Sequence, residues 1–483
     1  MKYIPAFVIL TFLAVFFVRA QDQDAGMAAG KAARTGYVAL KLEDLPRDEK
    51  GFLKPEIWDI IAAEAKANPN SNEARTLQER GVSQAYYATY ANWKAPEPLP
   101  VGAGRLRNLS EPPKEPRFPL TDKVWSEHPG DASVCLWEDD KLAAMSLGVD
   151  DNCAGDLPYW KELSRKYGGL NITWNLISGN IDGVISKGRV SSAGTWKIWQ
   201  QMLDESYHLV SHSVTHHHDP VPADGWPGPE WEAAESIHQI DSHLPGHKTR
   251  VYVYAGAGVR VFGQPRNLIA SAWRPAIIKY YAAARGGGRN AINQANMIDY
   301  FDIHATTGSV PFLLSNTDPK MADQNLNNLF AADPKNPYHN YYRGWANVFI
   351  HFINNGKDFD TNPFNVAYGK VLEFYNQHRN ELWTGFIDDV VLYGQERDTA
   401  TVKTDEATNE KIAFTLVSKM EPTIFDYPLT IKVRLPDAWK TVAASQKTAT
   451  LPAQFVLHEG RPYALVKVAP DRGQVILKSV INK

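Results

Sequence analysis

Apolar and polar residues alternate along the middle of the chain as short strand-length runs and longer helix-length segments. Apolar runs of strand length cover residues 142–149, 171–177, 208–211 and 250–254, and helix-like segments between them cover residues 157–167, 195–205 and 231–243. Strands that alternate with helices favour βαβ units and a parallel sheet. We therefore predict an α/β fold for residues 121–400.

The two flanking regions have different patterns. Residues 21–120 contain helix-like segments at 55–65 and 74–90, after which prolines recur between positions 96 and 119 and break regular structure. We predict an N-terminal extension that packs over the central domain. Residues 405–483 carry short β-rich runs separated by turn residues, a pattern typical of a small antiparallel β-sandwich.

The beginning of the chain indicates export. Residues 1–20 combine a charged Lys2 with an apolar run and end at the small residue Ala20. This predicts a signal peptide cleaved near Ala20, and hence a secreted or periplasmic protein. An uncleaved N-terminal anchor is the alternative. No other stretch reaches the roughly 20 apolar residues that a membrane helix needs, so we expect no membrane contact beyond export.

Composition excludes some classes of partner. The formal net charge is −3, with acidic and basic residues nearly balanced, so nucleic-acid binding is not expected. The 14 Trp and 21 Tyr residues offer rings that can stack on sugars, although ordinary core packing accounts for most of them. Cys135 and Cys153 are the only cysteines. Export permits a disulfide, but we favour two free thiols. The oligomeric state is not predicted.

Two of the apolar runs end in residues that suit metal binding. The first run ends at the adjacent carboxylates Asp150 and Asp151, and the third is followed by His212 and His216. One carboxylate and two imidazoles make three protein ligands, which leaves one metal position open for water or substrate. The second carboxylate is then a candidate base. If residues 212–216 are helical, the two histidines lie on one face.

Each feature also has a simpler explanation. An Asp-Asp pair after a strand is commonly a solvated turn or a helix cap, and two histidines four residues apart occur by chance in many chains. Ser213 follows His212, so the glutamate of a zinc-protease helix is absent and that class is disfavoured. The order of the two features along the chain is what favours a metal site.

The segment Val149-Asp150-Asp151, followed by His212-Ser213-Val214-Thr215-His216, resembles the first two motifs of the polysaccharide deacetylases, carbohydrate esterase family 4. The resemblance extends over roughly residues 143–400 and implies a distorted, incomplete (β/α) barrel. It implies that Asp150 is the catalytic base, and that Asp151, His212 and His216 bind a divalent metal. Zn²⁺ suits this ligand set, and Ni²⁺ or Co²⁺ would also fit.

Other motifs of the family match less evenly. The family's third motif carries an arginine that steadies the catalytic aspartate, and the corresponding residues 251–258 contain none. Arg260, Arg274 or Arg285 are alternatives for that role. The small residues at 255–258 could line the site with backbone N–H groups. Residues 299–302 are the nearest candidate for the fourth motif, and they could equally be structural. Residues 344–352 resemble the fifth motif, in which a buried strand delivers the general acid, here His351.

Together these features predict a metal-dependent deacetylase that acts on an acetylated poly- or oligosaccharide. In this scheme Asp150 removes a proton from water and His351 protonates the departing amine or alcohol. Two alternatives stay open: a metal-dependent hydrolase of another acyl or amide substrate, and a carbohydrate-binding protein that has lost catalysis.

Overall fold

The structure, a computed structural model, describes most of the chain from residue 72 onward. The described residues are 72–183, 185, 190–216, 225–255, 266–286, 291–307, 325–330, 341–357 and 359–480, together with 59, 62–63, 65–67 and 69–70. The predicted signal peptide lies outside them.

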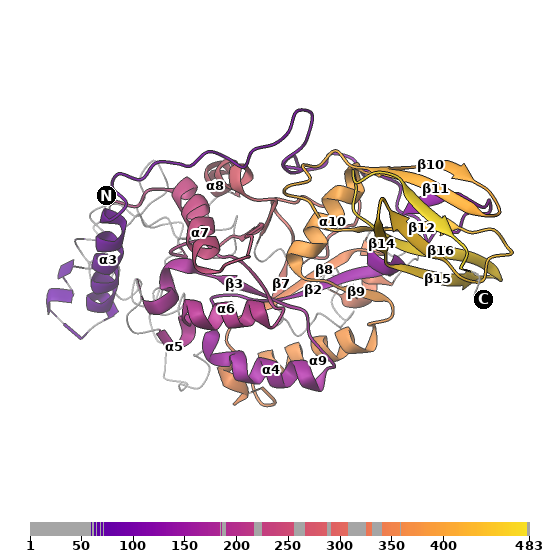
Figure 1. Ribbon diagram of the computed structural model, residues 1–483. Coiled ribbons are helices and arrows are strands. Elements are labelled where there is room, and N and C mark those ends of the chain that lie inside the picture. The colour runs from indigo at the N-terminus through magenta and orange to yellow at the C-terminus, as the bar shows by residue number, and fades with distance from the viewer. Residues whose placement is uncertain are drawn as a thin grey trace.

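The centre of the molecule is an eight-stranded sheet in which every paired neighbour is parallel (Figure 1). Its strand order is β6-β5-β4-β3-β2-β8-β7, and β9 also pairs with β2. The strands are β2 (Ala143–Val149), β3 (Ile172–Leu176), β4 (His208–Ser211), β5 (Val251–Val253), β6 (Ala283–Arg285), β7 (Thr306–Thr307), β8 (Trp345–Ile350) and β9 (Leu382–Thr384). The predicted parallel α/β core is therefore present.

The central sheet is curled. At one edge, Arg285 of β6 forms a parallel bridge with Ile303, and only a few residues later β7 pairs with β8 at the other edge. The segment 303–307 thus links the two edges. Strands β2, β3 and β8 are buried along their whole length, as expected of parallel strands covered on both faces. This architecture is consistent with a (β/α) barrel.

Helices cover the outside of the curled sheet (Figure 1). Thr195 caps α6 by accepting a hydrogen bond from the Ile198 N–H at 3.3 Å, and proline stands in the first turn of α4 and α7. The α-helices are α4 (Leu157–Lys166), α5 (Val190–Ala193), α6 (Trp196–Asp204), α7 (Pro229–His243), α8 (Arg266–Tyr280), α9 (Pro363–Gln377) and α10 (Ile387–Thr399). Short 3₁₀ turns are η2 (Glu138–Asp140), η3 (Ala154–Asp156), η4 (Ser178–Gly183), η6 (Leu326–Leu329) and η8 (Asn354–Gly356).

Helix α3 (Asn72–Ala88) is the main described element of the N-terminal region. It occupies nearly the span 74–90 predicted from the sequence. The other predicted helix, at 55–65, lies largely outside the described residues, although Asp59, Ala62 and Ala63 are helical. Tyr86 and Tyr87 of α3 make edge-on ring contacts with Trp231 of α7. Helix α3 therefore packs directly on the central region.

Two antiparallel sheets follow α10 at the C-terminal end (Figure 1). Their orders are β1-β12-β16-β15 and β10-β11-β17-β13-β14. The strands are β1 (Ala132–Val134), β10 (Thr401–Ala407), β11 (Lys411–Val417), β12 (Leu429–Arg434), β13 (Ala443–Gln446), β14 (Ala449–Leu451), β15 (Ala453–His458), β16 (Arg461–Val468) and β17 (Val475–Lys478). We call these two sheets the C-terminal sheets.

The C-terminal sheets share one apolar cluster with the central sheet and α10. Tyr252 and Val391 belong to this cluster, together with Ile431 and Leu477 of the C-terminal sheets. Strand β1, although it precedes the central sheet in sequence, pairs with β12. The two parts are therefore joined by a common interior.

Both cysteines are buried thiols outside any disulfide, and the Cys153 thiol donates to the Asp150 carbonyl at 3.0 Å. Cys135 lies just after β1, and Cys153 lies in the turn after β2. Among the helices that the structure describes, none has the length and apolar character needed to span a membrane.

Candidate metal centre

The site residues lie where strands of the central sheet end. Asp150 directly follows β2, His212 directly follows β4, His351 directly follows β8, and Arg285 is the last residue of β6. Since these strands are parallel, their carboxyl ends meet at the same rim of the curled sheet, where α/β barrels place their functional residues.

The turn after β2 directs Asp151 into the site. Asp151, Asn152 and Cys153 all have left-handed backbone conformations, with φ of 61°, 63° and 48°. A non-glycine residue in this region costs roughly 1–3 kcal/mol and persists only where its surroundings hold it. The buried Asn152 side chain does so: its Oδ1 accepts from the Ile177 N–H at 2.8 Å and its Nδ2 donates to the Ala193 carbonyl at 3.0 Å.

The two histidines are joined by a tight loop rather than by a helix. Residues 212–216 form no helical turn, and Ser213 and His216 have φ of 73° and 56°. The helical alternative for this segment is therefore wrong. Ser213 closes the loop because its Oγ accepts a hydrogen bond from the His216 N–H at 2.8 Å. The loop folds back, which brings both rings to the same carboxylate.

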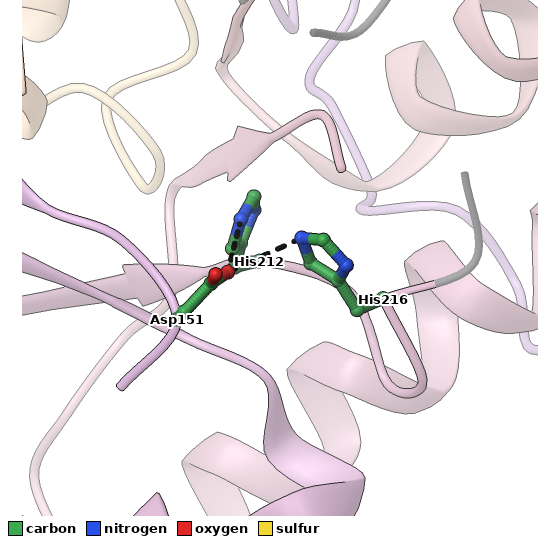
Figure 2. Close-up of side chains that lie close together, drawn as sticks. All are labelled: Asp151, His212 and His216. Carbon is green, nitrogen blue, oxygen red and sulfur yellow. Dashed lines mark ion pairs between the residues drawn. The ribbon is translucent and has the colours of Figure 1, made fainter. Parts of the chain in front are cut away.

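Asp151, His212 and His216 converge on one point (Figure 2). Oδ1 of Asp151 lies 3.3 Å from Nε2 of His212 and 3.2 Å from Nε2 of His216. A tetrahedral zinc ion with bonds of about 2.0–2.2 Å to nitrogen and oxygen keeps its ligand atoms roughly 3.3 Å apart. The three side chains therefore match the spacing that such an ion requires.

Hydrogen bonding around His212 shows why a cation fits this point. Nδ1 of His212 lies 2.9 Å from the carbonyl oxygen of Val253, which can only accept, so Nδ1 carries the proton. In the neutral ring Nε2 then offers a lone pair. This lone pair faces Oδ1 of Asp151, a buried oxygen without a hydrogen-bond donor among the described residues. A metal ion between the two lone pairs, or a proton on Nε2, compensates them.

Asp150 stands beside this group without belonging to it. Its Oδ2 is 4.0 Å from Nε2 of His212, and its side chain is almost fully buried. Oδ1 accepts a hydrogen bond from Nδ2 of Asn175, and Oδ2 accepts one from Nη2 of Arg285, each at 2.5 Å. Burial raises the pKa of Asp150, whereas the charge and the hydrogen bond of Arg285 lower it, and the net pKa lies below its usual value. Asp150 is therefore held as an anion.

Of the three candidate arginines, Arg285 is the one whose contact with Asp150 the described residues contain. It comes from β6, four strands away from β2 in the sheet order. In a flat sheet this separation would be about 19 Å, since neighbouring strands lie 4.7–4.9 Å apart. The 2.5 Å contact with Asp150 exists because the sheet is curled. The Arg285 guanidinium also lies 4.1 Å from the ring centroid of Phe349.

The other two candidate arginines are Arg260 and Arg274. Arg260 lies outside the described residues. Arg274 pairs with Asp299, with Nη2 to Oδ1 at 2.7 Å. Asp299 belongs to the segment 299–302. Of the small residues at 255–258, the described part of the chain contains only Ala255.

His351 lies at the opening of the site. Its Nε2 is 4.0 Å from Oδ2 of Asp151, and 36% of its side chain is exposed. It packs against Phe349, with ring centroids 5.7 Å apart. An imidazole that is partly exposed and beside the ligand group can exchange protons with a bound substrate.

Sequence reasoning missed two residues that support the site. Asn175 was visible as a lone amide in an apolar strand run, and a buried polar side chain in such a run needs a partner. Glu232 gave no signal because helix α7 approaches the loop only in the fold. Its Oε2 accepts hydrogen bonds from the N–H groups of Val214 and Thr215 at 2.8 and 3.0 Å.

A second group of possible metal ligands lies at the start of β4. It consists of His208, Asp388 and Asp389. Nδ1 of His208 is 2.8 Å from Oδ2 of Asp388, and the His208 ring stacks on Phe386. A histidine–aspartate ion pair accounts for these contacts, so this group provides a control for the first one.

Comparison of the sequence with known proteins gives one curated relative. No protein family profile matches the chain. Over 473 residues the chain is 30% identical to a gellan lyase from a Bacillus species. The match covers 95% of this chain but only 17% of the relative, so the chain spans about a sixth of that protein's length.

Solved structures show only weak structural similarity to the chain. A peptidoglycan deacetylase from Bacillus subtilis gives a TM-score of 0.26 at 11% identity, over 52% of this chain and 89% of its own. A glycoside hydrolase family 30 xylanase from Clostridium acetobutylicum gives 0.30 at 9% identity, over 73% of this chain and 100% of its own. Such low scores do not establish a common fold, and membership of the polysaccharide deacetylase family is not shown.

Proposed function

We propose that the protein is an exported, metal-dependent deacetylase that removes acetyl groups from a poly- or oligosaccharide. The observation that carries this proposal is the pairing of two adjacent aspartates with different surroundings. Asp151 faces His212 and His216, whereas Asp150 is held apart by Arg285 and Asn175. This difference supports Asp151 as the ligand and Asp150 as the base.

Asp151, His212 and His216 would hold a divalent cation, with Zn²⁺ as the first candidate and Ni²⁺ or Co²⁺ as alternatives. When bound, such a cation polarises a carbonyl oxygen and lowers the pKa of a water molecule. The rest of the chemistry belongs to side chains of this chain.

Asp150 would accept the proton of the attacking water. It is suited to this because Arg285 and Asn175 keep it ionised and fix its two oxygens. His351, on the open side of the site, would donate a proton to the nitrogen or oxygen of the sugar as the C–N or C–O bond of the acetyl group breaks. Hydrolysis of an amide or an ester needs this pairing of one base with one acid.

The carbohydrate part of the proposal rests on the relative, which acts on a polysaccharide according to its name. The same relative favours a second candidate, a lyase acting on a glycan. The two differ in product: a deacetylase releases acetate and leaves the chain length unchanged, whereas a lyase shortens the chain and leaves unsaturated ends. Hydrolysis of another acyl group is the third candidate, and it would release neither acetate nor unsaturated ends.

The test is acetate release from a panel of N- and O-acetylated oligosaccharides, with gellan included. We expect release by the wild-type protein, its loss with a chelator, and a loss of at least about 100-fold in Asp150→Asn. Intrinsic tryptophan fluorescence shows whether the variant is folded. Absence of acetate from every substrate would contradict the proposal, and unsaturated ends would favour the lyase instead.

A further inference from the structure

The loop that presents His216 is held from outside by two helices. Its four residues, Ser213–His216, include two left-handed conformations. The Ser213 hydroxyl accounts for one bond within the loop, to the His216 N–H. The N–H groups of Ser178 and Gly179 donate to the carbonyl oxygens of Ser213 and Val214 at 3.1 and 2.9 Å. Side chains of α7 and α3 add the hydrogen bonds to Thr215 and to the Val214 N–H.

Glu232 of α7 is the first of these contacts. Its side chain is fully buried. Its Oε2 accepts from the Val214 and Thr215 N–H groups, and its Oε1 accepts from the Thr215 hydroxyl and from the Trp226 indole N–H. Four donors on one carboxylate fix the middle of the loop, one residue before His216.

Tyr87 of α3 is the second contact. Its hydroxyl donates to Oγ1 of Thr215 at 3.0 Å, and only 2% of the residue is exposed. Tyr87, Val214 and Trp231 form one apolar cluster. Helix α3, more than 120 residues before the loop in sequence, therefore touches it directly.

We propose that Tyr87 and Glu232 act as positioning residues. Their hydrogen bonds to Thr215 hold His216 at the distance required for metal binding. This inference rests on the proposed metal site. It makes α3 part of the site, so that the N-terminal region controls metal affinity. Tyr87 and Glu232 touch neither metal nor substrate and act only through the loop.

The structure offers a matched control for Tyr87 on the same helix. Tyr86 also contacts Trp231 edge-on, but its hydroxyl accepts a hydrogen bond from Gln239 of α7 at 3.0 Å instead of reaching the loop. Tyr86→Phe and Tyr87→Phe each remove one hydroxyl between α3 and its neighbours. Only Tyr87→Phe removes a contact with the loop.

The experiment measures the Zn²⁺ dissociation constant of the full chain by competition with a chromophoric chelator, and the melting temperature of the metal-free protein. We expect Tyr87→Phe to weaken Zn²⁺ binding by about 10-fold, the lower end of the range for residues that support metal ligands. Tyr86→Phe should change it by less than about 2-fold, while both variants melt at similar temperatures. Glu232→Gln should weaken binding by about 10-fold or more.

Thr215→Val provides the second arm, because it removes the hydroxyl that Tyr87 and Glu232 share. The double variant Tyr87→Phe/Thr215→Val should bind Zn²⁺ as Thr215→Val alone does, since both changes break one chain of contacts. Equal affinity of Tyr87→Phe and Tyr86→Phe, or fully additive losses, would overturn the inference.

Asp151→Asn separates this inference from the function on which it rests. If Asp151→Asn abolishes Zn²⁺ binding while Tyr87→Phe leaves it unchanged, only the positioning role is wrong. If Asp151→Asn binds Zn²⁺ as the wild type does, the metal site is wrong and the inference falls with it.

Discussion

At the scale of residues, the site depends on one buried ion pair. Asp150 and Arg285 are each almost fully buried, and their contact joins the two strands that a flat sheet would hold apart. Burying two charges is costly unless each compensates the other. The pair therefore supports the curled sheet as well as the ionised state of Asp150.

We expect Arg285→Gln to destabilise the protein by about 3 kcal/mol, because it leaves the Asp150 carboxylate buried without its partner. Asp150→Asn should destabilise it by a similar amount, for the converse reason. The double variant should lose clearly less than the sum of the two. Urea unfolding followed by tryptophan fluorescence measures all three free energies.

Arg274→Gln is the control for this cycle. It breaks the Arg274–Asp299 pair, whose side chains are about one-fifth exposed, so it should cost less than Arg285→Gln does. Strictly additive losses for Arg285→Gln and Asp150→Asn would show that the two side chains do not stabilise one another.

At the scale of elements, apolar runs predicted the strands and helices that hold the ligands. The runs at 142–149 and 208–211 became β2 and β4, and residues 344–352 delivered β8. These segments are buried and regular, so local pattern and tertiary structure agree. The adjacent aspartates and histidines were predicted as site candidates because they directly follow such runs.

Contacts between elements that are distant in the chain could not be predicted from the sequence. The sequence offered three arginines for Asp150 and no means to choose between them, because the choice depends on the curl of the sheet. The hydrogen bonds from Glu232 and Tyr87 to Thr215 depend on how α7 and α3 pack against the loop. Asp151 and His216 have left-handed backbone conformations. Neither is a glycine, so the sequence did not mark these positions as tight turns.

Helix α10 contains a buried acid that links stability to pH. Glu396 is only 2% exposed, and burial raises its pKa to about 9, helped by nearby carboxylates. The charged groups that act on it are Asp426, Asp471, Arg250 and Arg472. An acid whose pKa is raised by folding holds its proton longer in the folded state, so the free energy of unfolding falls as pH rises from about 4.3 to about 9.

Glu396→Gln should remove this dependence. Between pH 5 and pH 8, the free energy of unfolding of the variant minus that of the wild type should increase by up to about 1.4 kcal/mol per pH unit. Urea unfolding at several pH values gives both curves, and Glu373→Gln, at an exposed position of α9, serves as the control. Parallel curves for wild type and Glu396→Gln would contradict the assignment.

At the scale of the whole molecule, one interior joins the central sheet, α10 and the C-terminal sheets. A buried ion pair crosses the same boundary, with Nζ of Lys432 in β12 at 2.9 Å from Oδ2 of Asp140 in η2. The rim that carries the site holds one of the two groups of possible metal ligands that the described residues form. A cation bound there would stabilise the folded chain as a whole, because the unfolded chain lacks the site.

The most direct test of the account is the number of Zn²⁺ ions bound per chain, measured by calorimetric titration of the chelator-treated full-length protein. We predict one tightly bound ion, a melting temperature that rises on binding, and loss of both effects in Asp151→Asn. Asp388→Asn, which disrupts the His208 group instead, should bind Zn²⁺ as the wild type does. Absence of tight binding, or binding that survives Asp151→Asn and is lost in Asp388→Asn, would contradict the account.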